Sequence, residues 1–133
     1  MTFSSSLALL LTAFLFGGSV LYSFGFAAFV FTNLPADQAG PLIRKAFPHF
    51  YLWVIVTAVA AALSFLWVDG VSAAILLAVA LSTVPTRQLL MPAVNAATDS
   101  GDKQRFKRLH GLSVVITLIQ IVLVGYVLLR LLG

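Results

Sequence analysis

The sequence contains no cysteine, and its only acidic residues are four aspartates. Without cysteine the chain can form no structural disulfide, no thiolate metal site and no cysteine nucleophile. The aspartates lie in or beside the segments between apolar runs, so no pair of catalytic acids stands within a run. A Gly-x-Ser-x-Gly sequence, a phosphate-binding glycine loop and a His-Glu-x-x-His sequence are also absent. We therefore do not expect a hydrolytic enzyme.

Charge is scarce throughout the chain, whereas apolar residues are abundant. Only 9% of the 133 residues are charged, 61% are hydrophobic, and the mean hydropathy is +1.07. Soluble domains hold roughly 45–50% apolar and about 25% charged residues, because polar groups must cover their surface. The composition predicts one membrane domain over residues 1–133, with the lipid bilayer as its outer solvent.

Four long apolar runs follow one another along the chain. A helix needs about 20 apolar residues to cross a bilayer, and an open strand cannot satisfy its backbone in lipid. We therefore predict an all-α fold, an integral membrane four-helix bundle. The predicted spans are residues 7–31, 48–68, 71–95 and 106–131. Only Asp69 and Gly70 separate the second span from the third, so these two spans form an antiparallel hairpin.

The segment between the first two spans has an amphipathic pattern. Arg44 and Lys45 occupy one helical face, and apolar side chains recur at helical spacing on the other. These apolar residues are Ala39, Leu42, Ile43, Ala46 and Phe47. The pattern predicts a short interfacial amphipathic helix that lies on the cytoplasmic leaflet.

Seven of the eight cationic side chains fall on the side of the first and third connections, leaving Arg130 opposite. They are Arg44, Lys45, Arg87, Lys103, Arg105, Lys107 and Arg108. The positive-inside rule places them beside anionic headgroups on the cytoplasmic side. We expect a bacterial inner membrane, with both termini on the periplasmic side. No binding motif accompanies the net charge of +4, so we expect no nucleic acid partner.

Polar side chains form a stripe along the fourth span. They are His110, Ser113, Thr117 and Gln120, spaced by three, four and three residues. This spacing puts them on one helical face, which should turn toward protein, because a neighbouring helix supplies hydrogen bonds worth roughly 0.6–2 kcal/mol. Two interpretations stay open: the stripe is interhelical packing, or it lines a site or path for a solute.

The third span contains Pro85 and Pro92, which predict a kink between them. Arg87 lies between the prolines and either reaches a headgroup phosphate or points inward, where it would bind an anion or a carboxylate. Together with Gln88 and Asn95, Arg87 would face the stripe and form a polar seam with it. The candidate substrate-binding residues are His110, Ser113, Thr117, Gln120, Arg87, Gln88 and Asn95.

His49 opens the second span and His110 opens the fourth, both near the predicted cytoplasmic boundary. Two imidazoles at matched depth could ligate haem b from two sides, or each could simply hydrogen-bond at a helix end. Transition-metal sites normally need three or four ligands, and no carboxylate lies within a span. We therefore assign no metal ligands. We expect no cofactor, and haem b is the alternative.

Small residues also recur every four positions on the first span, at Ser19, Ser23 and Ala27. Such a face lets helix backbones approach closely. It serves either packing within the chain or a homodimer.

The stretches FTNLPADQAGPLIRKAFPHFYL (residues 31–52) and RFKRLHGLSVVITL (residues 105–118) resemble the transmembrane protein 205-like family. The likeness extends over nearly the whole chain and implies a four-span fold and, for the animal members, a link to drug and metal-complex resistance. Thr117 stands where the family often has an asparagine, so a ligand contact by that amide is in doubt here. The resemblance extends, for the fold alone, to copper-resistance D proteins and a haem-binding protoporphyrinogen oxidase.

Three hypotheses follow for the function. The first is a protein that binds or transports a small solute, cation or metal complex along the polar seam. The second is a haem-binding membrane redox protein that uses His49 and His110. The third is a non-catalytic partner subunit of a membrane complex, in which the stripe serves packing alone.

Overall fold

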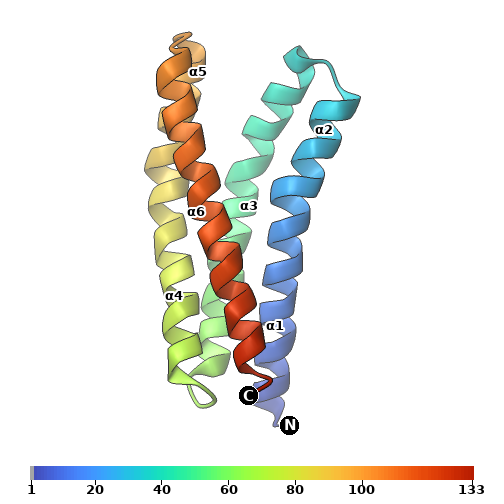
Figure 1. Ribbon diagram of the computed structural model, residues 1–133, viewed down its shortest axis with the longest axis vertical. Helices are drawn as coiled ribbons and strands as arrows, with labels where there is room; N and C mark the ends of the chain where they lie inside the picture. The colour runs from blue at the N-terminus through green and yellow to red at the C-terminus, as the bar shows by residue number, and fades with distance from the viewer. Residues whose placement is uncertain (1) are drawn as a thin grey trace.

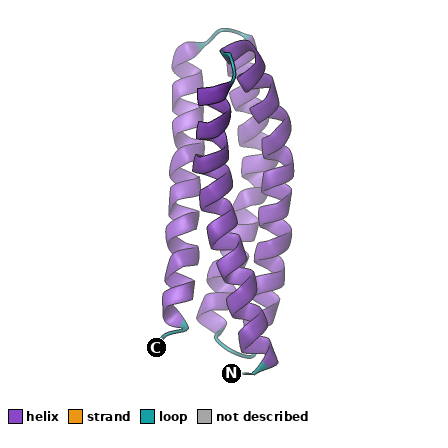
Figure 2. Ribbon diagram, turned by 90° about the vertical axis from the view of Figure 1, so that its right-hand side faces the viewer, coloured by secondary structure: helices purple, strands orange, loops and turns teal. Residues whose placement is uncertain are grey.

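The computed structural model describes residues 2–133, and helices make up almost all of this part of the chain (Figure 2). Four long helices run side by side, and each is long and apolar enough to cross a membrane (Figure 1). The first long helix comprises α1 (Phe3–Val20), η1 (Leu21–Phe26) and α2 (Ala27–Asn33), and the second is α3 (Ala36–Phe65). The third comprises α4 (Gly70–Pro85), η2 (Thr86–Leu90) and α5 (Met91–Asp99), and the fourth is α6 (Lys103–Arg130). The predicted all-α four-helix membrane fold is confirmed.

Short connections with capping side chains set the helix ends. The Asp69 carboxylate accepts a hydrogen bond from the backbone N–H of Val71 (3.2 Å), and that of Asp102 accepts one from Arg105 (3.1 Å). These caps satisfy backbone donors that have no partner within the helix. Gly101 has a φ of 72°, a left-handed conformation that glycine adopts without strain. The chain therefore reverses tightly before α4 and before α6.

The four long helices pack in a ring in which every neighbour is antiparallel. Both α1 and α4 pack against α3 and against α6. The two termini and the connection before α4 share one end of the bundle, which we call the terminal end (Figure 1). The largest fully buried side chains, including Leu15, Phe65 and Leu76, fill the half of the bundle next to this end.

At the opposite end the bundle divides into two arms. One arm consists of α2 and the N-terminal part of α3, and the other consists of α5 and the N-terminal part of α6. Within each arm the two helices pack together, but no comparable packing joins α2 to α6 or α3 to α5. Figure 1 shows the arms diverging. The π-helical segments η1 and η2 lead directly into α2 and α5, so each arm begins where a helix changes its winding.

The predicted interfacial helix is not a separate element. Residues 39–47 are helical, but they form the N-terminal part of α3, which continues through Pro41 and Pro48. Part of their apolar face packs on protein: Ala39 is fully buried, and the Tyr22 hydroxyl donates to the Ala46 carbonyl at 3.0 Å, while Leu42 stays 41% exposed. Because the segment continues directly into the second long helix, it stands along the bundle and is not a separate helix on a leaflet.

The third long helix is irregular between its two prolines. The irregular segment η2 lies between Pro85 and Pro92, and the helix continues on both sides of it. At the position of the predicted kink the structure therefore has a π-helical segment, and the helix is not interrupted. The second long helix ends at Phe65, three residues before the predicted boundary at Val68, because the chain already turns there toward the Asp69 cap.

Candidate functional site

A cavity of about 730 Å³ lies between the two arms. Its volume falls within the range of roughly 300–1,000 Å³ that is typical of small-molecule sites. The wall is mainly apolar and receives aromatic side chains from both arms. These are Phe24, Phe31, Phe47, Tyr51 and Phe106. The cavity exists because the arms diverge above the packed half of the bundle.

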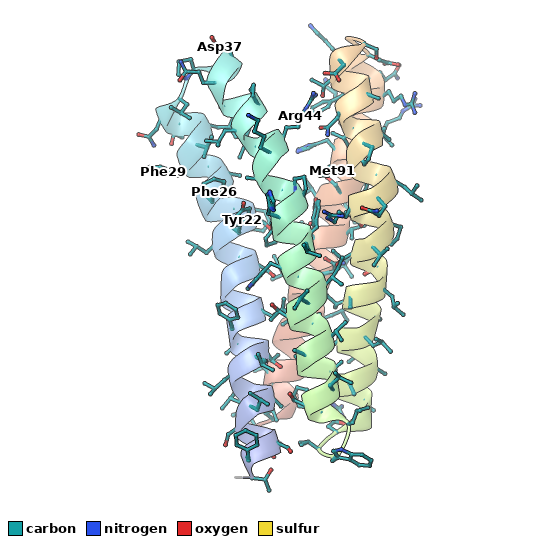
Figure 3. All side chains as sticks on the ribbon, turned by 180° about the vertical axis from the view of Figure 1, so that it is seen from behind. Tyr22, Phe26, Phe29, Asp37, Arg44 and Met91 are labelled. Atoms are coloured by element: carbon teal, nitrogen blue, oxygen red, sulfur yellow. The ribbon has the colours of Figure 1, made fainter. Side chains whose placement is uncertain are left out.

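A charged bridge crosses one side of this cavity. The Arg44 Nη2 lies 2.9 Å from the Asp99 Oδ1, and it also donates to the Asn95 carbonyl at 3.3 Å. Figure 3 shows Arg44 on the arm that faces α5. Asp37 and Lys45 line the rim as well, and neither has an ion-pair partner among residues 2–133. The rim thus holds one closed ion pair, one free cation and one free anion.

The polar stripe of α6 turns toward the bundle, and its members lie in two settings. His110, Ser113 and Thr117 line the cavity. The amide of Gln120 instead donates to the hydroxyls of Ser82 (2.8 Å) and Thr83 (3.1 Å) on α4. Gln120 is therefore interhelical packing, while the other three residues stand where a solute could reach them. Whether they bind one stays a prediction.

Two contacts within α6 set the positions of Ser113 and His110 at the N-terminal end of the stripe. The Ser113 hydroxyl donates to the His110 carbonyl at 2.7 Å, so its hydrogen is used within α6. The His110 ring stacks on Phe106, with ring centroids 5.3 Å apart and an angle of 13° between the planes. This stacking gives the imidazole a defined position on the cavity wall.

The residues of the third long helix separate into two groups. Asn95 lines the cavity, but Arg87 and Gln88 are not part of its wall. The Arg87 Nε donates to the Pro48 carbonyl at 3.0 Å, and its Nη1 donates to the Gln88 Oε1 at 2.8 Å. Successive residues of a helix point in different directions, and here the neighbouring Thr86 faces the cavity. The structure thus does not bring Arg87 and Gln88 into one site with the stripe.

The two histidines do not meet in the cavity. Both imidazoles are exposed, but His110 lies on the wall and His49 does not. The neighbouring wall residues Phe47 and Tyr51 are four positions apart, and a residue midway between them points to the opposite face of α3. Haem b held by both imidazoles within this cavity does not fit. The described part of the chain also contains no group of three or more His or Asp side chains that could hold a metal ion.

The small-residue face of the first long helix is used within the chain. Ser19 is 8% exposed, and Ser23 and Ala27 line the cavity. Ser19 therefore serves packing within the chain, while Ser23 and Ala27 face the cavity. A homodimer through these three residues stays a prediction.

The sequence did not reveal several residues of the cavity. The amphipathic pattern of residues 39–47 predicts a position on the leaflet, and with it headgroup contacts for Arg44 and Lys45. The pairing of Arg44 with Asp99 had no sequence signal beyond their opposite charges. Ser23 is a further wall residue: its hydroxyl oxygen is buried and has no hydrogen-bond partner among the described residues.

Toward the terminal end the cavity is closed. Thr117 also borders a void of about 10 Å³ that is lined further by Ser19 and Gln120. A void of this size holds about one water molecule at most. In this conformation the large cavity is therefore reached from the half of the bundle that contains the arms, and not through the packed half.

Comparison with known proteins identifies the family but not an activity. No curated protein and no solved structure matches the chain. One family model, described as a domain of unknown function (DUF4149), matches residues 10–103, which include most of the first long helix and all of the next two. This protein belongs to the DUF4149 family.

Proposed function

We propose that this protein binds a small organic solute in the cavity between the arms and transports it by a change in the separation of the arms. The cavity itself carries the proposal, because it combines an apolar wall with polar and charged groups at one end. Sites for small organic molecules have this composition, with few polar groups that fix the orientation of the ligand. The absence of extensive packing between the arms supports their movement.

The chemistry of the wall favours an organic solute over a bare cation. No aspartate lies deep in the packed half of the bundle, and the wall is mainly apolar. A metal ion would lack the three or four donors that it normally requires. A metal complex with organic ligands, in contrast, would behave as an organic solute here.

The distribution of charge supports an orientation with the arms toward the cytoplasm. Arg130 is paired with Asp69 at the terminal end, at 2.8 Å. The arm half holds the other seven cationic side chains and three aspartates, and therefore the whole net charge of +4. By the positive-inside rule we propose that the arms face the cytoplasm of a bacterial inner membrane and that both termini face the periplasm.

The resemblance to the transmembrane protein 205-like family agrees with this proposal. It implies a link to drug and metal-complex resistance in the animal members of that family. Removal of a toxic organic compound from the membrane is one form that solute transport by this cavity would take. The haem and partner-subunit hypotheses receive no comparable support from the arrangement of the residues.

Dye binding by the purified protein tests the proposal. Anilinonaphthalene sulfonate has an apolar body and one anionic group, and a ligand that binds the folded state raises its unfolding temperature in a saturable way. We expect this saturable rise in the native chain and in Val115→Trp, because Val115 is exposed on α6. Val114 lines the cavity, so Val114→Trp should abolish the rise. An equal rise in both variants would reject the proposal.

A further inference from the structure

We propose that the ligand is an anionic amphiphile that reaches the cavity sideways from the membrane, through the opening between α2 and α6. This inference rests on the proposed function and adds to it the class of ligand and the route. Three observations carry it: the difference between the two sides of the cavity, its depth in the bilayer, and the charge around its rim.

The two sides of the cavity differ in how they are closed. On one side, Arg44 links α3 to α5 through Asp99 and the Asn95 carbonyl. On the other side no hydrogen bond or ion pair between described residues joins α2 to α6, and the two helices do not pack extensively. On this second side, the wall residues that α2 and α6 contribute include the apolar Phe31 and Val114. An opening with apolar edges admits lipid-dissolved molecules more readily than hydrated ones.

The position of the cavity along the membrane normal suits a molecule with one apolar and one polar end. Trp67 is 89% exposed beside the start of α4 at Gly70, as expected of an aromatic residue at the membrane interface. A helix crosses a hydrocarbon core of about 30 Å in roughly 20 residues, so the far boundary falls near Met91. Thr86 therefore lies on the hydrocarbon side of this boundary, and Asp99 lies beyond it in the headgroup layer. The cavity wall includes both residues and spans the boundary.

The charge at the rim favours an anionic end group. Arg44 and Asp99 neutralise each other, and Lys45 is the cation on the wall without an ion-pair partner. Asp37 is the one unpaired acid there, but the arm half as a whole carries the net charge of +4. Within a Debye length of about 10 Å this excess attracts an anion to the rim. The acyl-like end of the ligand would then lie against the aromatic wall.

Lipid retention measured by native mass spectrometry of the full chain tests this inference. The protein is delipidated and then mixed with phosphatidylglycerol, with phosphatidylcholine of the same acyl chains, or with glycerol 3-phosphate. We expect one phosphatidylglycerol per chain, retained about fivefold more than phosphatidylcholine, since one lysine favours an anionic headgroup by about that factor. We expect no retention of glycerol 3-phosphate, which has no apolar end.

Matched variants locate the lipid. Ala27 lines the cavity on α2 and Ala28 beside it in the sequence is exposed, so Ala27→Trp should lose the retained lipid while Ala28→Trp keeps it. Lys45→Gln should remove the preference for phosphatidylglycerol, and Lys107→Gln, outside the wall, should not. The comparison of Lys45→Gln with Lys107→Gln still tests the inference if Ala27→Trp does not fold.

Equal retention of the two phospholipids, or of lipid by both tryptophan variants, would overturn the inference. The proposed function would stand in that case if Val114→Trp still abolished dye binding. Retention of glycerol 3-phosphate alone would likewise overturn the inference, because it would indicate a water-soluble ligand that reaches the rim from the aqueous side.

Discussion

Arg44 and Asp99 are 55 positions apart in the sequence, yet they join the two arms through a two-point ion pair, with Nη2 2.9 Å from Oδ1 and Nη1 3.4 Å from Oδ2. The other ion pair in the described chain, between Arg130 and Asp69, lies at the terminal end. Within residues 2–133 the Arg44 bridge is therefore the one ionic link between α3 and α5. We infer that it limits how far the arms separate.

Removal of this link should widen the arms. The chain has no native cysteine, so spin labels can be placed at Gln38→Cys and Gln104→Cys, which are exposed on opposite arms. We expect a longer and broader distance distribution in Arg44→Ala than in a Lys107→Ala control. Exposed ion pairs contribute only about 0–1 kcal/mol, so the unfolding temperature should barely change. Identical distributions in the two variants would mean that the bridge does not hold the arms.

Gly18 should tolerate no side chain. A Cβ added at this position would overlap the ring of Trp53, whereas one added at Gly17 would meet no atom within 4 Å. We expect Gly18→Ala to lower the unfolding temperature, because the indole must move within a packed interface. Gly17→Ala is the matched control and should be neutral or stabilising, since alanine favours a helix interior over glycine by about 1 kcal/mol. Similar behaviour of the two variants would show that α1 and α3 are packed more loosely than described.

The Gln120 amide should stabilise the contact between α6 and α4. Interhelical hydrogen bonds in membranes contribute about 0.6 kcal/mol on average and at most about 1.7 kcal/mol. Gln120→Leu should lose about this much, measured by unfolding in detergent, and Ile119→Leu on the exposed neighbour should lose none. A double-mutant cycle with Ser82→Ala isolates the interaction between the two side chains. A coupling free energy of zero would show that their hydrogen bond does not stabilise the protein.

Stability at low pH should depend on Asp69. Hydrogen bonds from Arg130 and from Ser72 (2.6 Å) hold the pKa of this carboxyl well below its ordinary value of 3.8. The unfolded chain therefore binds the proton more readily, so the stabilisation is complete above about pH 4 and is lost as pH falls further toward the lowered pKa.

Unfolding temperatures measured between about pH 5 and pH 3 check this expectation. The native chain should lose more stability over this range than Asp69→Asn, which keeps an oxygen for the helix cap but has no charge to lose. The other three aspartates are present in both proteins, so their contribution cancels in the comparison. Parallel curves would contradict the role of the Asp69–Arg130 pair.

The four long helices could be predicted because a bilayer allows few alternatives to apolar helices of about 20 residues. The irregular segment of the third long helix was also predictable, since Pro85 and Pro92 remove backbone donors on either side of η2. The segment η1 was not, because Leu21–Phe26 contains no proline. Residues 39–47 were misplaced for a related reason: an amphipathic pattern is the same whether its apolar face meets a leaflet or another helix.

The candidate site was only partly predictable. A spacing of three and four residues is enough to place Ser113, Thr117 and Gln120 on one inward face. It cannot tell that Gln120 meets the hydroxyls of α4 while Thr117 meets a cavity, because this depends on where the arms diverge. Arg87 shows the same limit, since the Pro48 carbonyl that accepts its hydrogen bond lies 39 positions away in the sequence.

Protection of a single cysteine by a ligand tests the central claim most directly. Ser113 lines the cavity, and Leu112 beside it is 49% exposed on the outer face of α6. We predict that anilinonaphthalene sulfonate, at about ten times its Kd, slows the reaction of Ser113→Cys with N-ethylmaleimide about tenfold. The reaction of Leu112→Cys should be unchanged. Equal rates with and without the dye at Ser113→Cys, or equal slowing at both positions, would contradict a ligand-binding cavity between the arms.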